Sequence, residues 1–174
     1  MGAGKSSVGR ALGEHLNWAF EDLDQRIEAR EQRTVAEIFR DSGEQAFRLA
    51  ERLALQQVLE ESGHAEKVIA LGGGAFVQKE IAALLKSAGA PTIFLDARPD
   101  ELWQRCRNQA EAAGIERPLL RDPEQFAQLY AERRRAYLKA SHRIETGGRT
   151  IDAITKEIAK AVKALRRSRA IRKN

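Results

Sequence analysis

Short apolar runs alternate with helical periodicity along the chain. Four such runs predict strands at 19–23, 68–71, 92–95 and about 143–146. Each run is followed by apolar residues at helical spacing, and this alternation is typical of a parallel sheet covered by helices. The pattern predicts an α/β fold.

Several residues mark where helices begin and end. Thr34 and Glu37 form a capping-box pattern, and Gly63 is placed to end a helix over 44–62. Two prolines suit first-turn positions, and Thr150 can cap a last amphipathic helix. The prolines are Pro99 and Pro123. The apolar face of the last helix consists of Ile151, Ile154, Ile158 and Val162.

The segment from about 108 to 122 has weak periodicity and mixed charge. It predicts a mobile loop, and long loops in small domains are usually functional. We expect it to form a lid, at about 108–121.

Composition limits the classes of protein to which the chain can belong. Its 174 residues, 43% of them hydrophobic, fit one domain over 1–174. No run of 18 apolar residues is present, so we expect no membrane association. The single cysteine, Cys106, cannot make an internal disulfide, which favours a cytoplasmic location.

Basic residues contribute to the net charge of +5, and they gather in a C-terminal tail at about 165–174. The tail is compatible with a nucleic-acid arm or with a solvated helix end. No aromatic residue interrupts the run, so stacking on bases is not indicated. We therefore expect no nucleic-acid partner.

The N-terminus matches the last part of the phosphate-binding pattern G-x-x-x-x-G-K-[ST]. Glycines let backbone N–H groups approach phosphate oxygens, and the following helix, at about 5–16, would point its positive end at the anion. Lys5 would contact the β- and γ-phosphates, and Ser6 would ligate Mg²⁺. The alternative is a chance lysine in a small-residue terminus. The predicted nucleotide-binding residues are Gly2, Ala3, Gly4, Lys5, Ser6 and Ser7.

Two carboxylates follow this loop. Asp22 and Asp24 come at the end of the first predicted strand, and residues two apart in a strand point to one side. A phosphotransferase needs one acidic group near Mg²⁺ and another to orient the attacking hydroxyl. The alternative is a polar strand end that leads into a turn.

Arginines and glycines complete the candidate site. Arginine binds carboxylates through two parallel hydrogen bonds, and consecutive glycines let a substrate lie against the backbone. Each feature also has an ordinary explanation, such as a surface arginine or a flexible turn. The candidates are Arg48, Arg117, Arg133, Gly72, Gly73 and Gly74, while Phe39, Phe47 and Tyr137 are expected to pack.

The ordered set resembles the shikimate kinase family from Met1 to about Thr146. Its motifs are Gly2 to Ser6, Asp22-Leu-Asp24, Ile27-Glu28, Ile38-Phe39, Gly43-Glu44, Phe47-Arg48, Glu51, Gly72 to Gly74, Arg117-Pro118-Leu119-Leu120, and Arg133 with Tyr137. The resemblance implies a P-loop NTPase-like three-layer α/β/α fold with a five-stranded parallel sheet. It implies transfer of the γ-phosphoryl group of ATP to the 3-hydroxyl of shikimate, on the route to chorismate and the aromatic amino acids.

The resemblance also implies residue roles. Lys5, Ser6 and Asp22 would serve the phosphates and Mg²⁺, and Asp24 would bind shikimate and act as base. Arg48 and Arg133 would hold the carboxylate, and Arg117 would close over the phosphates from the lid. Gly72, Gly73 and Gly74 would line the substrate site. The family leans towards monomers.

The chain departs from the family pattern at its start, where the first strand and the first glycine of the loop are absent. We expect both to be encoded immediately upstream. The adenine-stacking arginine of the family is either Arg105 or Arg107 here. Other hypotheses are a kinase of another hydroxy-acid such as gluconate, a nucleotide-binding module without catalysis, and nucleic-acid binding through the tail.

Overall fold

The four predicted strands are present and form two parallel pairs. Strand β1 (Ala19–Asp22) pairs with β2 (Lys67–Ala70), so that Asp22 lies opposite Ala70. Strand β3 (Ile93–Asp96) pairs with β4 (His142–Glu145), so that Asp96 lies opposite Glu145. The predicted bounds were right to within one residue.

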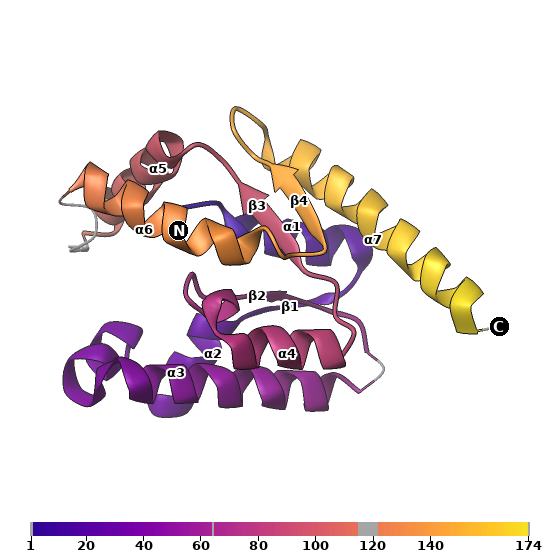
Figure 1. Cartoon of the computed structure of the whole chain (residues 1–174), viewed down its shortest axis with the longest axis horizontal. Coiled ribbons are helices and arrows are strands. Elements are labelled where there is room, and N and C mark those ends of the chain that lie inside the picture. The colour runs from indigo at the N-terminus through magenta and orange to yellow at the C-terminus, as the bar shows by residue number, and fades with distance from the viewer. Residues whose placement is uncertain (1, 64, 115–121, 174) are drawn as a thin grey trace. The chain divides into compact units, whose positions relative to one another are not determined.

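The structure is a computed structural model that describes residues 2–63, 65–114 and 122–173. Two compact units are distinguished in it, each with one strand pair (Figure 1). The first strand pair belongs to the unit of Ser6–Ala90, called the β1–β2 unit below. The second belongs to the unit of Met1–Lys5 and Pro91–Asn174, called the β3–β4 unit.

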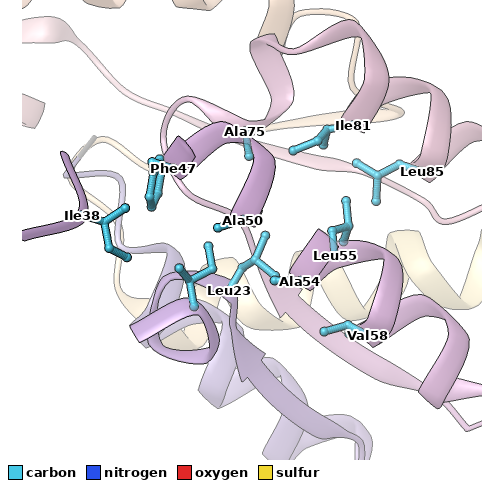
Figure 2. Close-up of a cluster of buried hydrophobic side chains, with 11 residues drawn as sticks. Leu23, Ile38, Phe47, Ala50, Ala54, Leu55, Val58, Ala75, Ile81 and Leu85 are labelled. Atoms are coloured by element: carbon cyan, nitrogen blue, oxygen red, sulfur yellow. The ribbon is translucent and has the colours of Figure 1, made fainter. Parts of the chain in front are cut away.

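The β1–β2 unit is covered by helices that bury one apolar cluster. Its helices are α1 (Lys5–Leu16), α2 (Leu23–Glu31), α3 (Val35–Ser62), the short η1 (Ala75–Val77) and α4 (Lys79–Ser87). Figure 1 shows α3 and α4 running side by side. The cluster between them and α2 includes Leu23, Ile38, Phe47, Leu55, Val58, Ile81 and Leu85, all buried (Figure 2).

Local hydrogen bonds set the bounds of α3. Thr34 Oγ1 accepts from the backbone N–H of Glu37 at 3.2 Å, and Glu37 Oε2 accepts from that of Thr34 at 2.7 Å. The predicted capping box is therefore confirmed. Gly63 ends the helix as predicted, while Gly43 breaks its regular geometry with φ +80° and ψ 172°.

The β3–β4 unit carries α5 (Pro99–Ala113), α6 (Pro123–Tyr137) and α7 (Ile151–Lys173). Both prolines stand in first turns, as predicted. Helix α7 packs beside β4 (Figure 1). Thr150 Oγ1 caps it, because it accepts from Ala153 N–H at 3.2 Å.

Two expectations for this unit were wrong. Residues 108–113 belong to α5 and not to a loop, because (i, i+4) pairs such as Arg107–Glu111, at 2.6 Å, and the burial of Ala110 favour helix. Residues 115–121 of the predicted lid, Arg117 included, lie outside the described residues. Ile151 is 48% exposed and does not join the buried face of α7, because that face begins one turn later, at Ile154.

Candidate active site

The phosphate-loop residues combine left-handed backbone with a helix start. Gly2 has φ +59° and Gly4 has φ +77°, conformations that suit glycine. A Cβ on Gly2 would come 2.5 Å from the carbonyl oxygen of Leu102 and 2.7 Å from Cys106 Sγ, so no larger residue fits. Ala3 is buried, and Lys5 is the first residue of α1. Backbone N–H groups at this helix start have no partner within the helix, as an anion site requires.

Ser6 and Asp22 form a direct pair within the β1–β2 unit. Ser6 Oγ donates to Asp22 Oδ2 at 2.6 Å, and Asp22 Oδ1 accepts from the backbone N–H of Asp24 at 3.1 Å. Asp22 therefore ends β1 and also caps α2. The predicted metal pair is adjacent in space although sixteen residues separate it in sequence. Ser7, in the next position of α1, is exposed.

Asp24 is not part of the strand, which corrects the prediction. It lies in the first turn of α2, because the Asp22 cap begins the helix before the strand can continue. Asp24 nevertheless lies beside the triple glycine. A Cβ on Gly72 would come 2.7 Å from Asp24 Oδ1 and 2.6 Å from Oε1 of Glu51. The two carboxyl groups therefore converge on Gly72.

Arg48 projects from α3 onto the same turn. Its Nη1 donates to Glu51 Oε2 at 2.8 Å, and its Nε and Nη2 donate to Glu44 Oε1 at 3.2 and 3.1 Å. A Cβ on Gly74 would lie 2.7 Å from Arg48 Cζ, so the guanidinium rests on the glycine backbone. Gly73 lies in the turn between the two glycines.

Aromatic rings support the guanidinium. The Cζ atom of Arg48 lies 5.3 Å from the ring centre of Phe47 and 5.9 Å from that of Phe39. Phe47 is buried and Phe39 is 37% exposed, and both pack against neighbours as expected. Such contacts restrict the side chain without using its N–H donors.

Glu51 is the buried member of this cluster. Its side chain is fully buried and accepts from Arg48 and, at 2.6 Å, from Gln78 Nε2. Burial raises the pKa of Glu51 and the Asp24 charge adds to the rise, although the hydrogen bond from Arg48 opposes it. The pKa of Arg48 is raised: burial would lower it, but hydrogen bonds to Glu51 and Glu44 outweigh that effect. The guanidinium therefore stays positive.

An open depression of about 470 Å³ adjoins the Arg48 side chain. It is lined by residues of α3 and of the segment before and within α4, among them Glu44, Arg48, Arg52, Gln78 and Glu80. Its volume is in the range of small-molecule sites. Two arginines and two glutamates therefore line the depression.

The remaining predicted residues belong to the β3–β4 unit. Arg133 is half-buried in α6, one residue before Arg134. Arg105 donates to the backbone oxygen of Thr146 at 3.0 Å, whereas Arg107 pairs with Glu111 and lies 5.5 Å from the ring of Trp103.

The chain is similar to known proteins over most of its length. The family described as shikimate kinase matches residues 1–163. The chain belongs to the shikimate kinase family. It is 40% identical over 163 residues to a shikimate kinase of Symbiobacterium thermophilum, covering 91% of this chain and 89% of that protein. It is 35% identical over 159 residues to that of Persephonella marina, covering 91% and 92%.

Solved structures of the family have the same fold. Shikimate kinase from Acinetobacter baumannii in complex with shikimate has a TM-score of 0.82 at 29% identity, over 94% of this chain and 89% of that one. The enzyme from Bacteroides thetaiotaomicron has a TM-score of 0.80 at 31% identity, over 94% of each chain. The predicted family, the P-loop NTPase-like α/β fold and the class of ATP-dependent shikimate kinase are thereby confirmed.

Sequence reasoning did not assign a role to Glu51, although it noted the residue. Its neighbour in sequence, Arg52, also gave no local signal that it lines the depression. A spacing of three residues from Arg48 places Glu51 on the same side of a helix, and this was the available signal.

Of the described residues, none form a helix long and apolar enough to cross a membrane.

Proposed function

We propose that this chain transfers the γ-phosphoryl group of ATP to the 3-hydroxyl of shikimate through the residues described above. The observation that carries the assignment of roles is the meeting of Arg48, Asp24 and Glu51 around the triple-glycine turn. In this cluster Arg48 is a fixed cation for a carboxylate, and Asp24 is an acceptor for a hydroxyl proton. A small hydroxy-acid presents both partners.

Arg48 is suited to the shikimate carboxylate. Its hydrogen bonds to described residues use three N–H groups, one on each of Nε, Nη1 and Nη2. A guanidinium has five, so one remains on Nη1 and one on Nη2. A carboxylate accepts from two such N–H groups when it binds arginine. Arg133 would supply a second cation for the same group.

Asp24 is the proposed base. In the step we propose, the 3-hydroxyl oxygen of shikimate attacks the γ-phosphorus while its proton passes to a carboxylate oxygen of Asp24. The bond from that phosphorus to the β–γ bridging oxygen breaks, and ADP leaves with the electron pair. Lys5 and Arg117 would neutralise charge on the phosphates. Gly72, Gly73 and Gly74 would let the substrate ring lie near Asp24 and Glu51.

The N-terminal residues would bind the nucleotide. Gly2, Ala3 and Gly4 would offer backbone N–H groups to the phosphates, and Ser7 would contribute from the first turn of α1. The positive φ angles of Gly2 and Gly4 support this, because such backbone turns successive N–H groups towards one side. Whether Arg105 or Arg107 stacks on adenine is decided by their separate replacement.

The Ser6–Asp22 pair fits Mg²⁺. Both groups offer oxygen, which this ion prefers, and Mg²⁺ usually keeps waters and phosphate oxygens as its other ligands. Ser6 would hold the ion directly and Asp22 through water. When bound, the ion would neutralise phosphate charge.

We further propose one kinase domain over residues 1–174 that works as a monomer in the cytoplasm, without nucleic-acid or membrane partners. The lone Cys106 is buried, which suits a reducing compartment. Light scattering after size exclusion would test the monomer. DNA titration with and without the basic tail would test the absence of a nucleic-acid partner.

A coupled ADP-release assay with ATP, Mg²⁺ and shikimate tests the function. We expect Asp24→Asn to lower turnover about 100-fold or more, the size of a lost general base, and Lys5→Met to do likewise. Asp152→Asn, an exposed residue of α7 paired with Lys156, is the matched control and should keep normal turnover. A folded chain that phosphorylates gluconate and not shikimate would refute the assignment.

A further inference from the structure

A buried carboxylate at the end of β3 holds three donors. Asp96 is 2% exposed and accepts from Arg143 Nε at 2.7 Å, from Arg134 Nη2 at 2.7 Å and from the hydroxyl of Tyr130 by a very short bond. Its backbone oxygen also accepts from Thr146, at 2.7 Å from the backbone nitrogen. One residue therefore links β3 to α6, to β4 and to the loop after β4. The proposed catalytic steps make no use of it.

Two of these donors come from one face of α6. Tyr130 and Arg134 are four residues apart, so they lie one above the other on the helix. Two anchors on one face fix both the rotation of a helix about its axis and its position along that axis. Successive residues of an α-helix are about 100° apart. Arg133, next to Arg134, is therefore held at a defined angle to the anchored face.

We propose that Asp96 is a positioning residue for Arg133, acting by anchoring α6 through Tyr130 and Arg134. This inference rests on the proposed role of Arg133 in binding the shikimate carboxylate. Three consecutive arginines, 133–135, are alike in sequence but differ here. Arg134 is bound to the buried carboxylate, Arg135 is exposed, and Arg133, which precedes both, is half-buried.

A purely stabilising role would not require this chemistry. Buried ion pairs are often no more stabilising than apolar residues of similar volume, and some are kept for the specific geometry they impose. Arginine and carboxylate oxygens constrain each other in direction, which apolar packing does not. The Asp96 cluster has this directional character on the helix that carries Arg133.

The test is a double-variant cycle read out as shikimate affinity by titration calorimetry, with melting temperature in parallel. We expect Asp96→Asn to weaken shikimate binding about tenfold while ATP affinity changes less than about twofold, as expected if one substrate contact is misplaced. In an Arg133→Ala background the same change should weaken shikimate binding less than about twofold, because the side chain through which Asp96 acts is already absent. Arg48 keeps binding measurable there. Asp100→Asn, an exposed aspartate paired with Arg98, is the matched control.

The outcomes separate the two proposals. Equal weakening by Asp96→Asn with and without Arg133, or unchanged affinity in Asp96→Asn, overturns the positioning role alone. Failure of the unaltered chain to bind shikimate, or no effect of Arg133→Ala, contradicts the proposed function. If Asp96→Asn does not fold, Tyr130→Phe, which removes one anchor and keeps the ring, replaces it in the same cycle. A lower melting temperature without the affinity pattern also counts against positioning.

Discussion

The guanidinium of Arg48 lies directly on the backbone of Gly74. A Cβ at residue 74 would be 2.6 Å from Arg48 Nη1 and 2.7 Å from Cζ, far inside van der Waals contact. Gly74 has φ −102° and ψ −8°, which any residue adopts. A side chain at residue 74 would therefore force the Arg48 guanidinium to move.

Gly74→Ala should weaken shikimate binding by displacing Arg48. We expect KM for shikimate to rise about tenfold, which corresponds to ~1.4 kcal/mol, while KM for ATP stays unchanged. Steady-state kinetics with each substrate varied separately measures this. Gly63→Ala is the control, because a Cβ there meets no atom within 4 Å and only its φ of +49° is strained. It should lower stability by about 1–2 kcal/mol and leave KM alone. An unchanged KM in Gly74→Ala would contradict the placement of Arg48.

The two carboxylates that bind Arg48 should differ in importance. Glu51 is fully buried, whereas the side chain of Glu44 is 66% exposed. Hydrogen bonds to charged groups contribute about 1.5–3 kcal/mol when buried, and exposed ion pairs contribute ~0.2–1 kcal/mol. Glu51→Gln should therefore raise KM for shikimate at least about tenfold, and Glu44→Gln less than about threefold. Equal effects would show that burial does not distinguish the two partners.

Helix α1 needs glycine where it packs on β1. A Cβ on Gly9 would come 2.5 Å from Phe20 Cε2. Helix propensity favours alanine over glycine by ~0.8–1.0 kcal/mol, but overpacking costs about 1–3 kcal/mol. Gly9→Ala should therefore destabilise the chain by about 1 kcal/mol, measured by urea unfolding.

Phe20→Leu provides the rescue for this clash. The double variant should be less destabilised than the sum of the single changes, since the leucine leaves room for the new methyl group. Glu14→Ala, on the exposed side of α1, should change stability by no more than ~0.5 kcal/mol. Strict additivity of Gly9→Ala and Phe20→Leu would show that an alanine at residue 9 does not clash with the Phe20 ring.

Asp96 should make the free energy of unfolding fall at acid pH. Burial alone would raise the pKa of Asp96, but hydrogen bonds from Arg134 and Tyr130 outweigh it and hold the pKa below its ordinary value. The unfolded chain therefore binds more protons in this range. The stabilisation is present above the unfolded pKa, ~3.9, and is lost as pH falls through the folded pKa.

Urea unfolding at a series of pH values from 5 downwards measures this dependence of the unfolding free energy on pH. Asp96→Asn should flatten the dependence of unfolding free energy on pH below about 4, because the carboxyl that titrates there is gone. Asp152→Asn, which is 72% exposed, should keep the slope of the unaltered chain. An unchanged slope in Asp96→Asn would place the acid sensitivity on other carboxyl groups.

Much of the fold followed from local signals in the sequence. The Thr34–Glu37 capping box and the prolines at 99 and 123 act within a few residues, so their patterns are readable in one dimension. Competition between local choices was harder to predict. Asp22 could continue a strand or cap a helix, and the cap, through its bond to the N–H of Asp24, placed Asp24 in α2.

The site followed from motifs only in part. Arg48 and the triple glycine were assigned together, and the structure brings Arg48 and Gly74 into contact. The Asp96 cluster was not predicted, because its three side-chain donors lie 34 to 47 residues after Asp96 in sequence and no spacing rule joins them to it. Such contacts depend on which helix packs against which strand, and this is decided by the burial of the whole unit.

The backbone angles of Gly43 favour a D-residue over an L-residue. With φ +80° and ψ 172°, this residue takes a backbone shape that is unfavourable for an L-amino acid and ordinary for its mirror image. No atom lies within 4 Å of an L-configured Cβ built there, so the backbone conformation and not a clash is what strains L-alanine. A D-alanine introduced by chemical ligation at residue 43 should therefore be accepted where L-alanine is strained. The bend that lies between Phe39 and Arg48 in the sequence of α3 is thus encoded by the absence of chirality at one atom.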